Sequence, residues 1–544
     1  MTARITYIAA AALVAGLTLS DGARAFQEQP ASRPEGPDTT AAARIRAEAF
    51  EHSQVMDTAF WLTDRYGPRL NGSVEFEEAG EWAMTRLRGA GAVNVRKERF
   101  AAGPGWSLNR FHATMIAPRV MPIIAMPKAW SAGTRGTVTA AVVRASIANE
   151  QDAARYRGRL RDKVVLAQPA RAVRMLEYGD GPVLRYGDQD GKWMREAMTP
   201  GATAPAFGLP SPRAAFDVMQ FYREEGVVAV FDRGSPGDLA AGGSGLSWEQ
   251  QHVDGGTIVL EDRALPRANP STGVPQVTLA VEHYNRLVRL LEHEVPVSVE
   301  LNVGVTFRPE TQPTGFNIVG ELPGTDKAAE VVLIGAHFDS WHAGTGATDN
   351  AAGVAVMIEA LRIIRAAGLV PRRTIRIGLW GSEESGPWNG AETGLVGSRV
   401  YAAEHFGTRD NPKPEQAGAS VYFNLDNGTG RIRGVWTEGN TGAASLFSTW
   451  SEPVRDLGVD MISPRSVPQT DHMSFAAAGI PAFQFVQERY EYNSRTHHTN
   501  MDVYDRLQPD DLKQAAAVVA LFAWQAAAHD DLVPRVPAPQ AGRR

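Results

Sequence analysis

Acidic and imidazole side chains that can bind metal ions recur in order along the second half of the chain. They are His337, Asp349, the adjacent Glu383 and Glu384, Asp426, and one member of the pair His497 and His498. Two imidazoles and three carboxylates suit a pair of divalent, zinc-like cations, and a fourth carboxylate suits proton transfer. Because the chain contains no cysteine, such a site must be built from nitrogen and oxygen ligands.

Each of these residues also has a simpler interpretation when it is considered alone. Asp349 comes directly before an expected helix, where Asp is a favoured N-cap. Adjacent glutamates are usually an exposed acidic pair on the protein surface. Glu383 and Glu384 cannot point the same way in an extended chain, so one can bind metal while the other faces a water molecule. His497 and His498 diverge as well, and their spacing does not say which of them reaches the site. The joint arrangement favours a metal site.

Three expected strands would position these side chains, at residues 331–335, 374–380 and 421–425. Each ends just before a candidate ligand. In an open α/β sheet, ligands bind beyond the carboxyl ends of the strands, so the three strands should deliver their polar residues to one edge. Asp339, two residues after His337, is better suited to orient an imidazole than to bind metal.

The alternation of strands with helices, expected at 350–366 and 512–528, predicts an α/β fold with a doubly wound, mostly parallel sheet. Between about 120 and 300 the pattern changes to short apolar runs, among them 257–260, with many Gly and Pro, which indicates an inserted β-rich domain. The expected organisation is a signal peptide (1–25), a disordered leader (26–40), an α/β domain in two segments (41–120 and 299–530), the inserted domain (121–298) and a loose tail (531–544).

The first 25 residues have the features of an export signal. Arg4 precedes an apolar stretch over 5–19, and Ala23-Arg24-Ala25 resembles a cleavage site. A stretch of this length falls short of the ~20 residues that a membrane-spanning helix needs. We therefore expect no membrane span and an exported protein, periplasmic or secreted.

The composition describes a globular protein of more than one domain. The chain has 544 residues, 43% of them hydrophobic and 21% charged, with a formal net charge of −6. This mild acidity, without a long basic run, argues against a nucleic-acid partner.

Several motifs resemble the co-catalytic zinc aminopeptidases of peptidase family twenty-eight, in particular their carboxypeptidase Q-like branch. The resemblance covers residues 41–120 and 300–530, and the block between resembles a protease-associated insert. Each motif alone is weak, and together they are specific. They are Gly-Pro-Arg-Leu-Asn-Gly-Ser (67–73), Ala-His-Phe-Asp-Ser-Trp (336–341), Gly-Ala-Thr-Asp-Asn-Ala-Ala-Gly-Val (346–354), Glu-Glu (383–384), Gly-Leu-Val-Gly-Ser (394–398), Asp-His-Met-Ser-Phe (471–475), Gly-Ile-Pro-Ala (479–482) and His-Thr-x-x-Asp (498–502).

This resemblance implies two Zn²⁺ per chain. It assigns His337 and Asp426 to one zinc ion and Glu384 and His498 to the other, with Asp349 bridging them. It selects His498 over His497 because the family's histidine ligand begins the His-Thr-x-x-Asp pattern.

The resemblance also implies that Glu383 is the general base and that Asp339 orients a histidine. One departure is a segment over 385–393, between the Glu-Glu pair and Gly-Leu-Val-Gly-Ser, where Trp388 is a candidate pocket residue. Substrate preference therefore does not transfer from relatives.

The resulting hypothesis is an exopeptidase that hydrolyses peptides or dipeptides near a chain end, with a homodimer as a candidate assembly. Two alternatives remain: a single-zinc acyl transfer like that of glutaminyl cyclases, and a non-catalytic, receptor-like binding protein. Two bound metal ions per chain would favour the peptidase.

Overall fold

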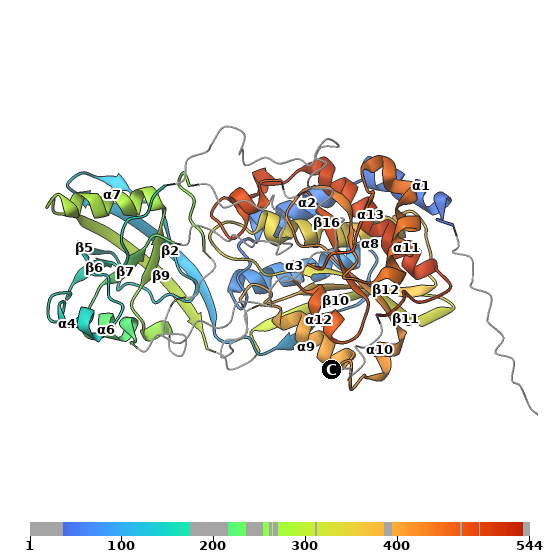
Figure 1. Ribbon diagram of the computed structural model, residues 1–544, viewed down its shortest axis with the longest axis horizontal. Helices are drawn as coiled ribbons and strands as arrows, with labels where there is room; N and C mark the ends of the chain where they lie inside the picture. The colour runs from blue at the N-terminus through green and yellow to red at the C-terminus, as the bar shows by residue number, and fades with distance from the viewer. Residues whose placement is uncertain are drawn as a thin grey trace, which may run out of the picture. The chain divides into compact units, whose positions relative to one another are not determined.

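The computed structural model describes residues 36–173, 216–234, 254–260, 264, 270–309, 313–385, 394–467, 470–488 and 490–536. These residues form two eight-stranded sheets with helices packed around them (Figure 1). The expected signal peptide at 1–25 and residues 386–393, with Trp388, lie outside the described residues.

The first sheet confirms the predicted α/β fold with a mostly parallel, doubly wound sheet. Four central strands run parallel, whereas β1, β10 and β14 each pair antiparallel with a neighbour. The strand order is β1 (Val93–Phe100), β10 (Gly315–Leu322), β12 (Arg373–Trp380), β11 (Lys327–His337), β13 (Ala419–Asn424), β16 (Ala482–Gln487), β14 (Ile432–Trp436) and β15 (Met461–Ser463).

Helices cover both faces of this sheet (Figure 1), which is why its central strands β11, β12 and β13 are buried along most of their length. The larger core lies on the face covered by α1 (Thr39–Glu51), α2 (Val55–Phe60), α3 (Val74–Gly89), α8 (Ala352–Ala366), α11 (Thr441–Ser451) and α13 (Pro509–Ala528). The opposite face packs against α9 (Val396–His405) and α12 (His472–Ala477).

The register of the central strands places their carboxyl ends level with one another. His337, the last residue of β11, lies beside Trp380 at the end of β12. Two residues before His337, Gly335 lies beside Asn424 at the end of β13. The segments that continue from these strands therefore begin at the same edge of the sheet, as the sequence predicts.

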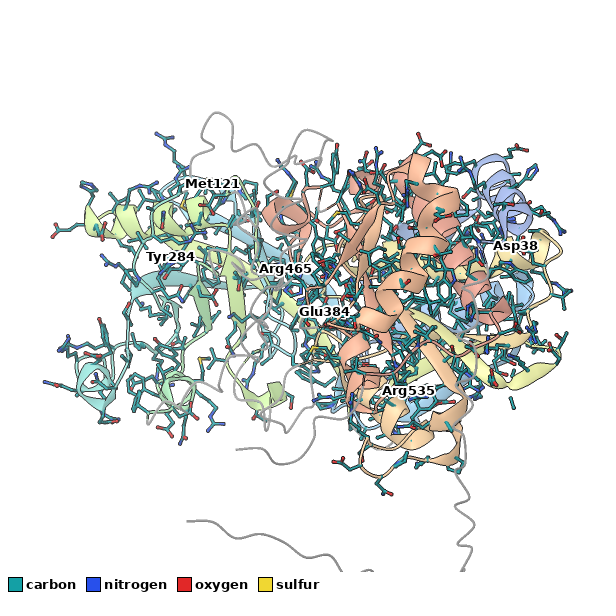
Figure 2. All side chains as sticks on the ribbon, turned by 45° about the vertical axis from the view of Figure 1, so that its right-hand side comes forward. Asp38, Met121, Tyr284, Glu384, Arg465 and Arg535 are labelled. Carbon is teal, nitrogen blue, oxygen red and sulfur yellow. The ribbon has the colours of Figure 1, made fainter. Side chains whose placement is uncertain are left out.

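The second sheet carries α7 (Val281–Glu292), whose buried Tyr284 (Figure 2) donates a hydrogen bond to the Gln168 carbonyl. Its two long antiparallel strands, β2 and β9, reach beyond the bounds of 121–298 expected for the insert. The strand order is β3 (Met121–Pro122), β2 (Gly105–Ala117), β9 (Ser298–Arg308), β5 (Val138–Arg144), β6 (Lys163–Leu166), β7 (Ala229–Asp232), β8 (Gln276–Leu279) and β4 (Ala125–Pro127).

The chain is ordered beyond the limits expected at both ends of the described region. Helix α1 begins at Thr39, inside the expected leader, because the Asp38 carboxylate caps it by accepting a hydrogen bond from the Ala41 amide. In the expected loose tail, Val533 is buried, and Arg535 (Figure 2) donates hydrogen bonds to the Gly479, Gln416 and Ala419 carbonyls. Among the described helices, none is long and apolar enough to cross a membrane.

Candidate metal centre

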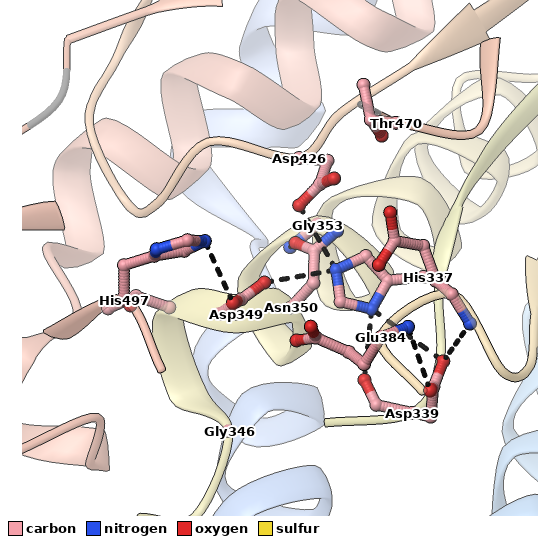
Figure 3. Close-up of polar contacts among 12 residues, drawn as sticks. His337, Asp339, Gly346, Asp349, Asn350, Gly353, Glu384, Asp426, Thr470 and His497 are labelled. Atoms are coloured by element: carbon pink, nitrogen blue, oxygen red, sulfur yellow. Dashed lines mark hydrogen bonds and ion pairs between the residues drawn. The ribbon is translucent and has the colours of Figure 1, made fainter. Parts of the chain in front are cut away.

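The imidazole of His337, at the end of β11, points one ring nitrogen at two buried carboxylates (Figure 3). Its Nε2 atom is 3.0 Å from Asp349 Oδ1 and 3.1 Å from Asp426 Oδ1. On the other side of the ring, Nδ1 donates a hydrogen bond to the Asp339 carbonyl at 3.0 Å. Because Nδ1 carries the hydrogen, Nε2 of a neutral ring faces both carboxylates with its lone pair, an arrangement that calls for a cation between them.

A second group forms around the other oxygen of Asp349. His498 Nε2 lies 2.9 Å from Glu384 Oε2 and 3.5 Å from Asp349 Oδ2. His497 stacks on His498, with ring centroids 3.7 Å apart, and its Nε2 lies 3.8 Å from Asp349 Oδ2. Asp349 thus faces both groups, and both histidines of the pair reach it.

Asp349 owes its position to an irregular start of α8. The helix begins at Ala352, two residues later than predicted, and Asp349 and Asn350 are non-helical and joined by a cis peptide bond. Asn350 Oδ1 accepts the Gly353 amide at 3.0 Å, so Asn350 makes the capping contact that the sequence also allowed for Asp349. A Cβ at Gly353 would lie 2.3 Å from Asn350 Oδ1, which explains the glycine there.

Asp502, to which the sequence analysis gave no role, fixes the backbone around Asp349. Its carboxylate accepts hydrogen bonds from the Thr348 amide at 2.6 Å, the Thr348 hydroxyl at 2.8 Å and the Asp349 amide at 3.2 Å. Burial raises the pKa of Asp502 to about 7. The only sequence signal was its place as the last residue of the His-Thr-x-x-Asp pattern.

Arg69 is a second positioning residue that the sequence analysis did not identify. Its side chain is fully buried and donates hydrogen bonds to the carbonyls of Phe338 at 2.8 Å, Leu62 at 2.6 Å, Thr345 at 3.2 Å and Gly346 at 3.0 Å. Burial lowers the pKa of Arg69 to about 10. The guanidinium ties the loop after His337 to the turn that leads to Asp349.

The contacts of Asp339 differ in part from the predicted ones. Its carbonyl, rather than its carboxylate, lies closest to His337 Nδ1, and the carboxylate oxygen Oδ1 is 3.9 Å away. The carboxylate instead accepts the amides of Glu383 at 3.0 Å and Glu384 at 3.3 Å. Asp339 therefore holds both the imidazole and the glutamate pair.

Burial and crowding shift the ionisation of the carboxylates and of His337. Burial raises the pKa of Glu383 well above its ordinary value and the pKa of Glu384 to about 8. Burial alone would lower the pKa of His337, but the carboxylates of Asp426 and Asp349 raise it well above the ordinary value. Because several buried carboxylates lie close together, the site favours a bound cation, or bound protons when no cation is present.

The donor set fits divalent metal ions. Among the described residues, three groups could each hold a metal ion, because the donor atoms within each group lie within 4.8 Å of one another. The groups are Asp349, His497 and His498; His337, Glu383 and Glu384; and His337, Asp349 and Asp426. Glu384 Oε1 is buried without a hydrogen-bond partner among the described residues. A buried acceptor left in this state is costly unless a ligand satisfies it.

Comparisons with known proteins agree with this architecture. Residues 317–523 match the model of Peptidase family M28. Carboxypeptidase Q of Mus musculus is 25% identical over 475 residues, which is 87% of this chain and 86% of that protein.

Solved structures share the fold as well. A Peptidase M28 precursor from Shewanella amazonensis SB2B has a TM-score of 0.60 and 25% identity, covering 92% of this chain and 99% of that one. BSAP, a zinc aminopeptidase from Bacillus subtilis, has the same fold, with a TM-score of 0.51 and 18% identity, covering 88% of this chain and 95% of that one. Residues 317–523 are therefore a Peptidase family M28 domain, and this chain, which has relatives that span most of its length, is a metallopeptidase.

Proposed function

We propose that this protein is an exported exopeptidase with two zinc ions, which hydrolyses peptide bonds near a chain end as an aminopeptidase or dipeptidase. His337 and Asp426 would hold one ion, Glu384 and His498 the other, and Asp349 both. The observation that carries this proposal is the position of Asp349, with Oδ1 at 3.0 Å from His337 Nε2 and Oδ2 at 3.5 Å from His498 Nε2. A carboxylate that faces two donor groups is suited to bridge two ions.

Bound zinc ions would supply Lewis acidity, which acidifies water and polarises a substrate carbonyl. Glu383 accepts a proton from the attacking water at its carboxylate and returns it to the nitrogen of the leaving amine. Asp339 supports this role because its carboxylate holds the Glu383 amide at 3.0 Å and so fixes the start of the side chain.

The remaining parts of the proposal rest on features of the sequence and on the family resemblance of the inserted block. Residues 1–25 would direct export, periplasmic or secreted, and would be removed. The second sheet would be a protease-associated-like insert, with boundaries wider than those of 121–298 because β2 and β9 belong to it. The partners would be peptides or dipeptides, and a homodimer is the candidate assembly.

The substrate class follows from the chemistry of a free amine. A neutral α-amine is a nitrogen donor that suits zinc, so a peptide with a free N-terminus can be anchored where an N-blocked peptide cannot. Carboxypeptidase Q and zinc aminopeptidase are the names of relatives, and both describe cleavage at a chain end.

The test is a panel of dipeptides, longer peptides and their N-acetylated forms, assayed on zinc-loaded protein. We expect free-amine substrates to be cleaved and acetylated ones to react poorly. Glu383→Gln is the matched control: it should keep its zinc and lose about 10²–10⁴ in kcat, because only the proton acceptor is removed. Preferred cleavage of N-blocked peptides, or near-normal turnover by the metal-loaded variant, would contradict the proposal.

A further inference from the structure

Residues 256–260, which lie in sequence between strands β7 and β8 of the second sheet, pair with the residues that follow His498. The Leu260 amide donates to the His498 carbonyl at 2.8 Å, and the Asn500 amide donates to the Ile258 carbonyl at 3.2 Å. Val259 and Thr499 form the antiparallel bridge between them. The apolar run at 257–260 therefore pairs with the peptidase domain and not with the second sheet.

The side chain of Asn500 completes this pairing. Its Oδ1 accepts the Ile258 amide at 2.7 Å, and its Nδ2 donates to the Gly256 carbonyl at 3.1 Å. The Asn500 side-chain amide thus both accepts a hydrogen bond from and donates one to the backbone of residues 256–258. A shorter or purely apolar side chain could not do so. We call the paired segments 256–260 and 498–500 the latch.

The insert also contacts the loop that follows His337, through strand β4 and through residues 258 and 260. His342 donates from Nε2 to the Pro127 carbonyl of β4 at 2.8 Å, and burial lowers the pKa of His342 to about 4, so the ring is neutral. Ala343 packs in one apolar cluster with Ile258 and Leu260. The insert therefore contacts the segments downstream of both histidines of the metal centre.

The backbone of His498 shows why such support matters. Its φ of 57° lies in the left-handed region, which is unfavourable for a residue with a Cβ and persists only where the surroundings enforce it. On the C-terminal side, Asp502 is anchored to Thr348 and Asp349. The latch supplies the second anchor, at the His498 carbonyl itself.

We propose that Asn500 is a positioning residue for the second metal ion, acting through the latch to hold His498 in its ligating conformation. The inserted domain then helps to hold a metal ligand in place, although it supplies no ligand of its own in this proposal. This inference rests on the proposed role of His498 as a zinc ligand. Linkage makes the effect reciprocal: if the latch strengthens zinc binding, zinc must stabilise the latch by the same factor.

The test compares zinc release from wild-type and Asn500→Ala protein into a chromophoric chelator. We expect one of two release phases to accelerate about 10–100-fold, the cost typical of losing a group that orders a metal ligand, while the other phase is unchanged. Asn500→Asp, which keeps the acceptor for Ile258 but loses the donor to Gly256, should show the same selective acceleration. Asn109→Ala is the matched control, since it removes one exposed hydrogen bond between β2 and β9, to Thr306.

Amide hydrogen exchange gives a second readout that does not depend on activity. Zinc should slow exchange of the Leu260 amide in the wild type and have a much smaller effect in Asn500→Ala. Unchanged release from both Asn500 variants, or acceleration of both phases equally, would overturn the inference while leaving the two-zinc proposal intact. If His498→Ala still binds two zinc ions as tightly as the wild type, the proposed ligand set itself fails, and the latch has no metal to position.

Discussion

Asp349 presents one carboxylate oxygen to His337 and the other to His498, and this geometry sets the chemistry of the centre at the scale of single residues. The sequence alone allowed Asp349 to be a helix cap. The structure gives the capping contact to Asn350 and leaves the Asp349 carboxylate for the two imidazoles. His497 is the remaining ambiguity, because its Nε2 also approaches Asp349, at 3.8 Å.

Replacing each histidine of the pair separately resolves this ambiguity. His498 lies 2.9 Å from Glu384, so His498→Ala should leave one of two zinc ions bound and abolish most activity. Under the proposed ligand set, His497→Ala should keep both ions, because it removes the ring stacked on His498 and not a ligand. Metal content per chain after dialysis is the measurement, and loss of an ion from the His497 variant alone would reverse the assignment.

At the scale of elements, the site is assembled by loops whose backbone is held by buried polar side chains. Strand ends were predictable, because apolar runs followed by His337, Glu383 and Asp426 carry a clear pattern. The roles of Arg69 and Asp502 were not, since each acts on main-chain groups far away in sequence, and a pattern of residue types does not record such contacts. The pairing of 257–260 with Thr499 was missed for the same reason.

Arg69 gives a test of this element-scale support. Arg69→Met should lower the free energy of unfolding by on the order of 3 kcal/mol, because buried carbonyls lose their donor. Arg144→Met is the control: the Arg144 side chain is 42% exposed beside Glu292, and its loss should cost less than about 1 kcal/mol. Urea denaturation of the zinc-free proteins measures both, and equal effects would contradict the role assigned to Arg69.

At the scale of the whole molecule, ion pairs join distant parts of the chain around the first sheet. His405, on α9, lies 3.1 Å from Glu415 in α10 (Pro414–Gly418) and 3.1 Å from Glu98 in β1. Hydrogen bonds to Glu415 and Glu98 raise the pKa of His405 to about 9, and the hydrogen bond from His405 lowers the pKa of Glu415 to about 2. A charged His405 thus connects three elements.

This connection predicts a pH dependence of global stability. Because the pKa of His405 is raised on folding, its stabilisation is complete below the unfolded value of about 6.5 and is lost as pH rises through about 9. His405→Gln should be less stable than wild type by on the order of 1 kcal/mol at pH 6, since the pair is only half-buried, and the difference should shrink towards pH 9. A difference that stays constant from pH 6 to 9 would contradict this origin.

Localising the metal by anomalous X-ray scattering from crystals of the zinc-loaded protein tests the whole account most directly. The account predicts two zinc peaks about 3.5–4 Å apart, the first beside His337 and Asp426 and the second beside Glu384 and His498, with Asp349 between them. A single peak at full occupancy, or two peaks that share no ligand, would contradict it.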